Sequence, residues 1–303
     1  MTQAPPTYLL MPFFGAILFA TSSLAYKKAF EQGARVSQVF LANNLCLVAL
    51  FLPLLAFDEK PIPWIDLGQP LLAGSAFCAA NLLNFKALQA GDVSLVTPLM
   101  GTKVLFVALL ARLAFGESGG VTHIVAAAMT TAGIFLLGFT DNRAGRWVGA
   151  ATAYALMSGF TFACCDILMQ QWASSFGVLH FLPIMFGWVG LLSAGTAAFT
   201  GSITEAPWRR CWRWVGFAAI MMGFQALLIA TSISFFRDAT GINIVYSLRG
   251  LMGIGLVWIL GRRVAHLERG SSAPGALWAR VLGAVLILAA IVLAVQTTRW
   301  NPA

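Results

Sequence analysis

The chain alternates between long apolar runs and short polar breaks along almost its whole length. A helix needs about 20 apolar residues to cross a bilayer, and the runs reach that length. Breaks such as FDEKPIPW, TDNRAGRW, SITEAPWRRCWRW and GRRVAHLERGSSAPG separate them. The pattern predicts ten transmembrane helices, over Tyr8–Lys28, Val36–Phe57, Leu67–Gln89, Val93–Phe115, Val121–Phe139, Trp147–Trp172, Val178–Thr200, Trp212–Phe236, Gly241–Leu260 and Ala276–Val295.

Two tight turns occupy equivalent places in the two halves of this pattern. The third and fourth spans meet at Ala90-Gly91-Asp92, and the eighth and ninth meet at Arg237-Asp238. The chain therefore divides into five spans (residues 1–145) and five more (residues 146–303). An odd number of spans makes the second half enter the membrane from the opposite side, as in many secondary transporters. We expect an all-α membrane protein with ten transmembrane helices arranged as two inverted five-helix repeats, which form one integral membrane domain.

The two halves also repeat a charge pattern. DVSLVTPLMGTK (Asp92–Lys103) and DATGINIVYSLR (Asp238–Arg249) each open with an Asp and reach a cation eleven positions later. Eleven helical residues rise about 16 Å, which is about half of the hydrocarbon thickness. Lys103 and Arg249 are therefore expected near the bilayer midplane. Pro98, and Thr240-Gly241 at the start of the ninth span, are expected either to loosen these two helices and free carbonyls for a site or a hinge, or to form a packed kink.

Composition agrees with a membrane protein. Of the 303 residues, 59% are hydrophobic and 10% are charged, whereas a soluble domain carries about 25% charged residues. The net charge of +8 does not indicate nucleic-acid binding, because the cations lie in short loops beside apolar runs, where they set topology or meet lipid. Most loop cations fall on the side opposite the termini, so the positive-inside rule places both termini outside the cytoplasm. We expect an integral multi-pass protein of the cell (inner) membrane, with the lipid bilayer as its partner.

Lys103 and Arg249 are the leading candidates for a substrate site, since an ionisable residue at mid-membrane depth usually has a function. Facing one cavity, they would neutralise a carboxylate or a phosphate. The alternative is a structural ion pair with Asp166, or snorkelling to an interface. Asp166 in the sixth span is either a proton site coupled to the substrate or a satisfied counter-ion.

Four polar residues are further candidates for lining a substrate cavity. Asn81 and Asn84 share one face of the third span, and Tyr246 lies three residues before Arg249. Gln225 lies within the eighth span. Asn43 and Asn44 in the second span are weaker candidates. Each of these side chains could instead make interhelical hydrogen bonds, which is the commoner use of polar residues in membrane bundles.

The sequence gives no indication of an enzyme, a cofactor or a metal site. The spans contain no HExxH motif, Ser/His/Asp arrangement or carboxylate cluster. The three histidines lie at or just beyond span ends, and the five cysteines lack metal-ligand spacing.

Several segments resemble the drug/metabolite transporter superfamily in its ten-span, EamA-like form. They are FATSSLAYKKAF at the end of the first span, FKALQAGDVSLVTPLMGTKVLFVALLARLAFGE through the third and fourth, and TTAGIFLLGF in the fifth. The mid-helix Pro and the closing Gly-Glu of the family's fourth span correspond to Pro98 and Gly116-Glu117. The resemblance implies a transporter fold without naming a substrate, and it implies basic site residues in the fourth and ninth spans by analogy with members that carry sugar phosphates.

This chain departs from the family's pattern in three places. Ile244 and Arg263 stand where the second repeat would match Pro98 and Glu117. The break after the second span, usually basic in the family, is acidic at Asp58-Glu59. The family usually keeps both termini in the cytoplasm, which disagrees with the distribution of cations in this chain.

The expected function is secondary transport of a small anionic or zwitterionic metabolite by alternating access, with a proton or a counter-substrate as the candidate coupling partner. One alternative is a proton-coupled exporter of cationic drugs or metabolites that works through Asp166. Another is a membrane-embedded lipid-handling enzyme, against which the lack of catalytic groups argues. The substrate and the oligomeric state stay open.

Overall fold

The computed structural model describes residues 7–58, 60–91, 96, 99–115, 120–138, 146–200, 208–260 and 276–297. Asp92, Pro98, Glu117 and Arg263 lie outside these residues. Throughout the described part of the chain the regular secondary structure is helical, which confirms the prediction of an all-α protein.

Helices cover each of the ten predicted spans, in whole or in part. Short 3-10 helices are η1 (Thr7–Leu9), η2 (Leu52–Phe57) and η3 (Trp64–Asp66). The α-helices are α1 (Leu10–Glu31), α2 (Val36–Phe51), α3 (Gly68–Ala90), α5 (Lys103–Phe115), α6 (Gly120–Gly138), α7 (Arg146–Phe176), α8 (Val178–Thr200), α9 (Trp208–Phe236), α10 (Ala239–Tyr246), α11 (Arg249–Leu260) and α12 (Ala276–Thr297).

Several of these helices are suited to a bilayer. Large apolar side chains such as Leu72, Phe160 and Leu191 are exposed on the outside of the bundle, where lipid rather than water is the compatible solvent. Among the described residues, six segments are long and apolar enough to cross a membrane: Thr7–Glu31, Val36–Phe57, Trp64–Ala90, Gly149–Phe176, Val178–Ala197 and Arg210–Phe236.

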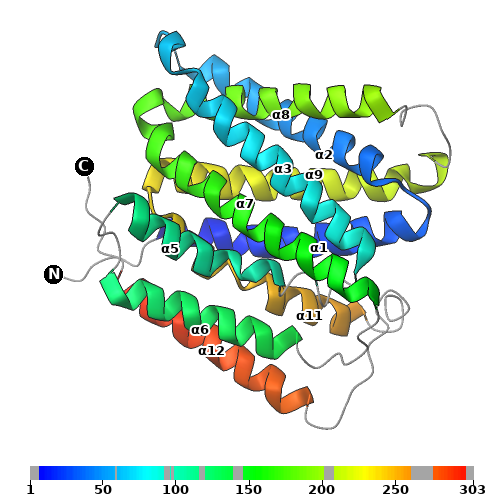
Figure 1. Ribbon diagram of the computed structural model, residues 1–303, viewed down its shortest axis with the longest axis vertical. Helices are drawn as coiled ribbons and strands as arrows, with labels where there is room; N and C mark the ends of the chain where they lie inside the picture. Colours follow the sequence, from blue (N-terminus) through cyan, green and yellow to red (C-terminus); the bar gives the residue numbers. More distant parts are fainter. Residues whose placement is uncertain are drawn as a thin grey trace.

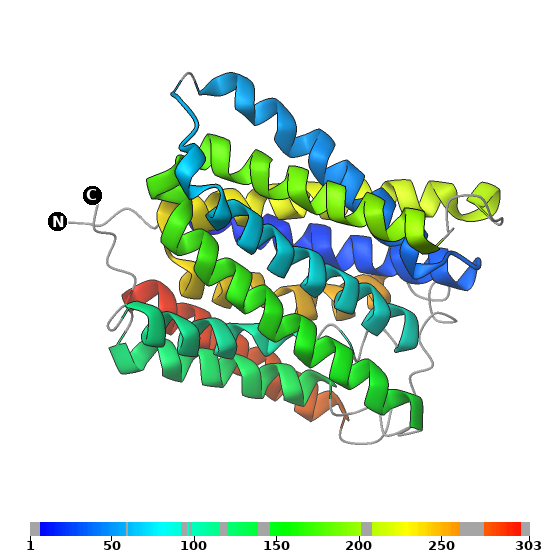
Figure 2. The same ribbon diagram turned by 45° about the horizontal axis from the view of Figure 1, so that its top comes forward.

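The helices lie side by side in one bundle (Figures 1 and 2). The most extensive contacts join α3 to α7, α1 to α9, and α6 to α12. Helix α2 packs on α8 and α9, and α8 also contacts α3. Helix α5 contacts α6, α7 and α10. In Figure 1, α1 begins and α12 ends at the same end of the bundle, whereas α7 begins at the opposite end.

Close helix contacts depend on glycine. A Cβ atom on Gly74 of α3 would lie 2.8 Å from the carbonyl oxygen of Met185 in α8, and a Cβ on Gly133 of α6 would lie 2.7 Å from the carbonyl oxygen of Gly283 in α12. Small residues bring helix backbones together in membranes, where packing rather than the hydrophobic effect drives association.

The ninth predicted span differs from the expectation, because α10 and α11 form it with a turn at Ser247 and Leu248. The Ser247 hydroxyl donates to the carbonyl of Ile244 at 2.6 Å. Loosening at Thr240-Gly241 was therefore predicted at the wrong place. The Asp238 carboxylate accepts from the Gly241 N–H at 2.8 Å, which caps the start of α10.

Candidate functional site

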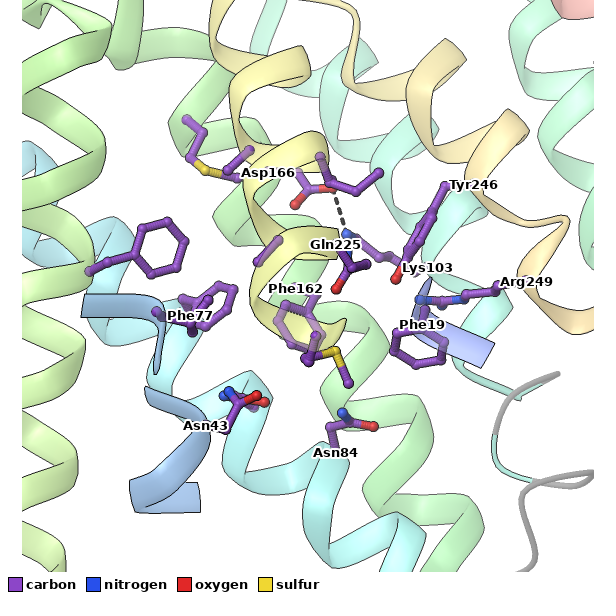
Figure 3. Close-up of a pocket in the computed structure, with 18 residues that line it drawn as sticks. Phe19, Asn43, Phe77, Asn84, Lys103, Phe162, Asp166, Gln225, Tyr246 and Arg249 are labelled. Carbon is purple, nitrogen blue, oxygen red and sulfur yellow. Dashed lines mark ion pairs between the residues drawn. The ribbon is translucent and has the colours of Figure 1, made fainter. Parts of the chain in front are cut away.

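One cavity of about 60 Å³ lies between helices of both halves. Its volume suits a handful of water molecules or a small solute. Phe19, Phe77, Phe162 and Phe186 give it aromatic walls. The structure brings to this cavity all seven residues that the sequence predicts for the site, which are Lys103, Arg249, Tyr246, Asn81, Asn84, Gln225 and Asp166 (Figure 3).

Lys103 and Asp166 form a buried ion pair on the cavity wall. The Lys103 Nζ atom lies 2.7 Å from Asp166 Oδ2, with the two side chains 7% and 4% exposed (Figure 3). Lys103 is the first residue of α5, and Asp166 lies in the second half of α7. The pairing predicted as an alternative role for these two residues therefore exists, and it compensates two charges that would otherwise be costly to bury.

Asn243 completes the surroundings of this ion pair. Its Nδ2 group donates to Asp166 Oδ2 at 2.6 Å and to the Ala239 carbonyl at 2.8 Å. Asn243 was not predicted. Its spacing of three residues from Tyr246, which is itself three before Arg249, is the signal that could have placed all three on one helical face.

Arg249 has different surroundings from Lys103. Its guanidinium donates to the carbonyl oxygen of Met100 at 2.8 Å. The Cζ atom lies 4.6 Å from the ring centre of Phe19 and 4.5 Å from that of Tyr246, so two cation–π contacts hold it. The Nε group is buried without a hydrogen-bond partner, and no carboxylate of the described residues lies within 4.0 Å of the guanidinium.

The charges on the cavity wall do not cancel. Lys103 and Arg249 are the cations and Asp166 is the anion among its lining residues. Since Lys103 is paired with Asp166, the positive charge that remains is on Arg249. A positive charge in a low-dielectric cavity attracts an anion more strongly than it would in water.

The amide side chains divide into two groups. Asn81 donates to Asn44 Oδ1 at 2.8 Å, as does Asn43 at 3.3 Å, and Tyr26 donates to Asn43 Oδ1 at 2.8 Å. Asn81 and the weaker candidates Asn43 and Asn44 thus make interhelical hydrogen bonds.

Asn84 and Gln225 behave differently from this network. Neither side chain has a hydrogen bond to the described part of the chain, and both line the cavity. Their amide groups are the ones left to meet a solute.

Comparison with known proteins supports a membrane transporter. Residues 6–139 match the sequence model of the EamA-like transporter family. An "uncharacterized transporter" from Archaeoglobus fulgidus is 27% identical over 169 residues, a match that covers 54% of this chain and 58% of that protein. The crystal structure of another protein has a similar fold, with a TM-score of 0.63 at 15% identity over 99% of this chain and 100% of the other.

Proposed function

We propose that this protein is a secondary transporter that moves a small anionic or zwitterionic metabolite across the cell membrane by alternating access. The observation that carries the proposal is the cation Arg249 on the wall of the cavity, which has no carboxylate within 4.0 Å among the described residues. A buried charge without a counter-charge is costly, and an anionic solute that enters the cavity would lower that cost. Arginine binds carboxylates and phosphates through two parallel hydrogen bonds.

Two inverted five-helix halves, residues 1–145 and 146–303, would provide the alternating access. If a two-fold axis relates the halves, α1 corresponds to α7, α2 to α8, α3 to α9, α5 to α10 and α11, and α6 to α12. The contact between α3 and α7 then has its counterpart in the contact between α9 and α1. The contact between α2 and α9 has its counterpart in the contact between α8 and α3. The pairs α2–α8 and α6–α12 map onto themselves. This pattern of neighbours supports a two-fold relation, and the cavity lies on its axis in the proposed scheme.

Lys103 and Arg249 would be equivalent residues of this scheme with different tasks. Each is the first residue of its helix, α5 or α11. Arg249 binds the anionic group of the substrate, and Tyr246 and Phe19 hold its guanidinium in place. Lys103 joins the site when its own ion pair opens.

Asp166 is the proposed coupling residue. While ionised it neutralises Lys103 at 2.7 Å, and uptake of a proton by Asp166 would release Lys103 toward the substrate. An anion and a proton would then be bound together. An exporter of cations needs Asp166 to receive the substrate, and the close contact with Lys103 opposes that alternative.

The proposal is tested by replacing Arg249 with Gln in the purified full-length protein. The wild type is expected to be stabilised by a carboxylate, a phosphate or an amino acid from a panel that also contains organic cations, by about 2.7 kcal/mol at a hundredfold excess over Kd. Arg249→Gln is expected to weaken that binding by about 1.5–3 kcal/mol, because a hydrogen bond to a charged group is lost. Thermal unfolding with and without ligand measures both effects, and uptake into proteoliposomes measures transport.

Arg112→Gln is the matched control, since Arg112 is an exposed arginine of α5 and its replacement is expected to leave ligand binding unchanged. Stabilisation of the wild type by cations alone, or full anion binding by Arg249→Gln, would contradict the proposal.

A further inference from the structure

The amide of Asn84 is buried on the cavity wall, and no residue in the described part of the chain forms a hydrogen bond with it. The residue is 1% exposed, and its Oδ1 atom has no hydrogen bond. Its Nδ2 group likewise makes no hydrogen bond within the described residues. In Figure 3, Asn84 and Asn43 lie on one side of the cavity, and Asp166, Lys103 and Tyr246 lie on the other.

The helix around Asn84 explains why its amide stays open. Asn81, one turn earlier on α3, is bonded to Asn44 of α2 at 2.8 Å, so this neighbouring amide is fixed against the adjacent helix. Helix α3 also packs along α7, where Ser158 donates to the Ala80 carbonyl at 2.7 Å. These contacts fix the orientation of α3 and leave Asn84 directed at the cavity. A buried amide without hydrogen-bond partners destabilises the folded protein. A bound group that forms hydrogen bonds with the amide removes that cost.

The chemistry of an amide restricts what would fit there. Its oxygen accepts hydrogen bonds while its NH₂ group donates them. A ligand carboxamide is complementary in both directions and can form two hydrogen bonds with Asn84 at once. A ligand ketone offers only an acceptor, and a methyl group offers neither.

We propose that Asn84 forms a second substrate subsite, which binds a primary carboxamide or a lactam at one end of a small carboxylate whose anionic end is held by Arg249. This inference rests on the proposed function, because it assumes that Arg249 binds an anion. The cavity volume of about 60 Å³ limits the substrate to a short chain. The substrate class is therefore a short carboxylic acid that carries an uncharged amide.

Isosteric probe pairs test this subsite directly. Oxamate and pyruvate, malonamate and acetoacetate, and succinamate and levulinate differ within each pair only by NH₂ in place of CH₃. Three chain lengths allow for the span between the two subsites. Affinities are measured on the purified full-length protein by ligand-dependent thermal unfolding, at constant pH and salt.

At one chain length, the wild type is expected to bind the amide about tenfold more tightly than the ketone, since a site built to hydrogen-bond a group rejects the analogue that lacks it. In Asn84→Leu this ratio is expected to fall to about one, with affinity for the ketone kept within about threefold. Asn84→Ala provides the same comparison should the larger side chain disturb folding.

The other outcomes contradict either the Asn84 subsite alone or both the subsite and the transporter proposal. Carboxylate binding without an amide preference at any length, or with a preference that survives in Asn84→Leu and Asn84→Ala, overturns the subsite and leaves the transporter proposal intact. Failure of every carboxylate, phosphate and amino acid to bind the wild type overturns both.

Discussion

At the scale of single residues, three side chains from three helices share one buried polar contact. Lys103 comes from α5, Asp166 from α7 and Asn243 from α10. They meet at Asp166 Oδ2, at 2.7 Å and 2.6 Å respectively. Removal of either member of the ion pair leaves the other charge desolvated without its counter-charge, which is the costly way to change a buried ion pair.

Asp166→Asn is expected to lower the free energy of unfolding by about 3–5 kcal/mol, because Lys103 loses its buried counter-charge. The double variant Lys103→Gln/Asp166→Asn is expected to lose less stability than the sum of the losses measured for Lys103→Gln and Asp166→Asn alone. Thermal unfolding of the four proteins in detergent, analysed as a double-mutant cycle, measures the coupling. Additive effects would show that the ion pair contributes nothing to stability. Asp58→Asn is the control carboxylate, since Asp58 pairs with His180 at the longer distance of 3.4 Å.

Residues whose chemistry is unusual for their depth can be located from the sequence. Lys103, Arg249 and Asp166 interrupt apolar runs, so charge alone identifies them, and the structure brings them to one cavity. The sequence does not separate Asn84 from Asn81, because three residues of helix place both on one side while their contacts differ. The aromatic neighbours of Arg249 cannot be predicted from the sequence. Phe19 is one of 23 phenylalanines, and nothing in its local sequence distinguishes it from those that face lipid.

At the scale of helices, the apolar pattern predicts where a helix lies better than it predicts whether that helix is continuous. It placed a span at Gly241–Leu260, where α10 and α11 lie, but it did not reveal the turn between them. Val245–Leu248 contains no charged residue, glycine or proline, so the pattern shows no clear break there. The signal is a local side-chain bond, from the Ser247 hydroxyl to the Ile244 carbonyl, of the kind that competes with regular helix bonding.

Gly74→Ala tests the close contact of α3 with α8. The added methyl group would lie 2.8 Å from the Met185 carbonyl oxygen, and a backbone atom cannot move aside as a side chain does. The substitution is expected to destabilise the protein by about 1–3 kcal/mol through overpacking, which thermal unfolding measures. Gly187→Ala on α8 is the matched control, since nothing lies within 4 Å of its added Cβ. Equal stability of the two variants would contradict the packing argument.

At the scale of the whole molecule, the distribution of cations predicts orientation. Glu31 at the end of α1 and Lys60 after η2 are exposed and are separated by a predicted span. Because most loop cations share the side of Glu31, the positive-inside rule places that side in the cytoplasm.

Single cysteines distinguish the two sides of the membrane, in a chain whose five native cysteines have been replaced. A membrane-impermeant maleimide applied to intact cells is expected to label Lys60→Cys and not Glu31→Cys, with both labelled after permeabilisation. The reverse pattern would place both termini in the cytoplasm, as the resemblance to the EamA-like form implies.

The charge of Arg249 has a consequence for the working cycle. In the proposed alternating-access cycle, the two halves move around a site that stays at one depth, and at some stage the empty site is closed to water on both faces with an unbalanced positive charge inside. A bound anion cancels the charge in both directions, so the loaded forms interconvert more easily than the empty one. While Asp166 stays ionised and paired with Lys103, this asymmetry favours exchange of one anion for another, whereas a proton on Asp166 would add a second positive charge and open the proton-coupled route.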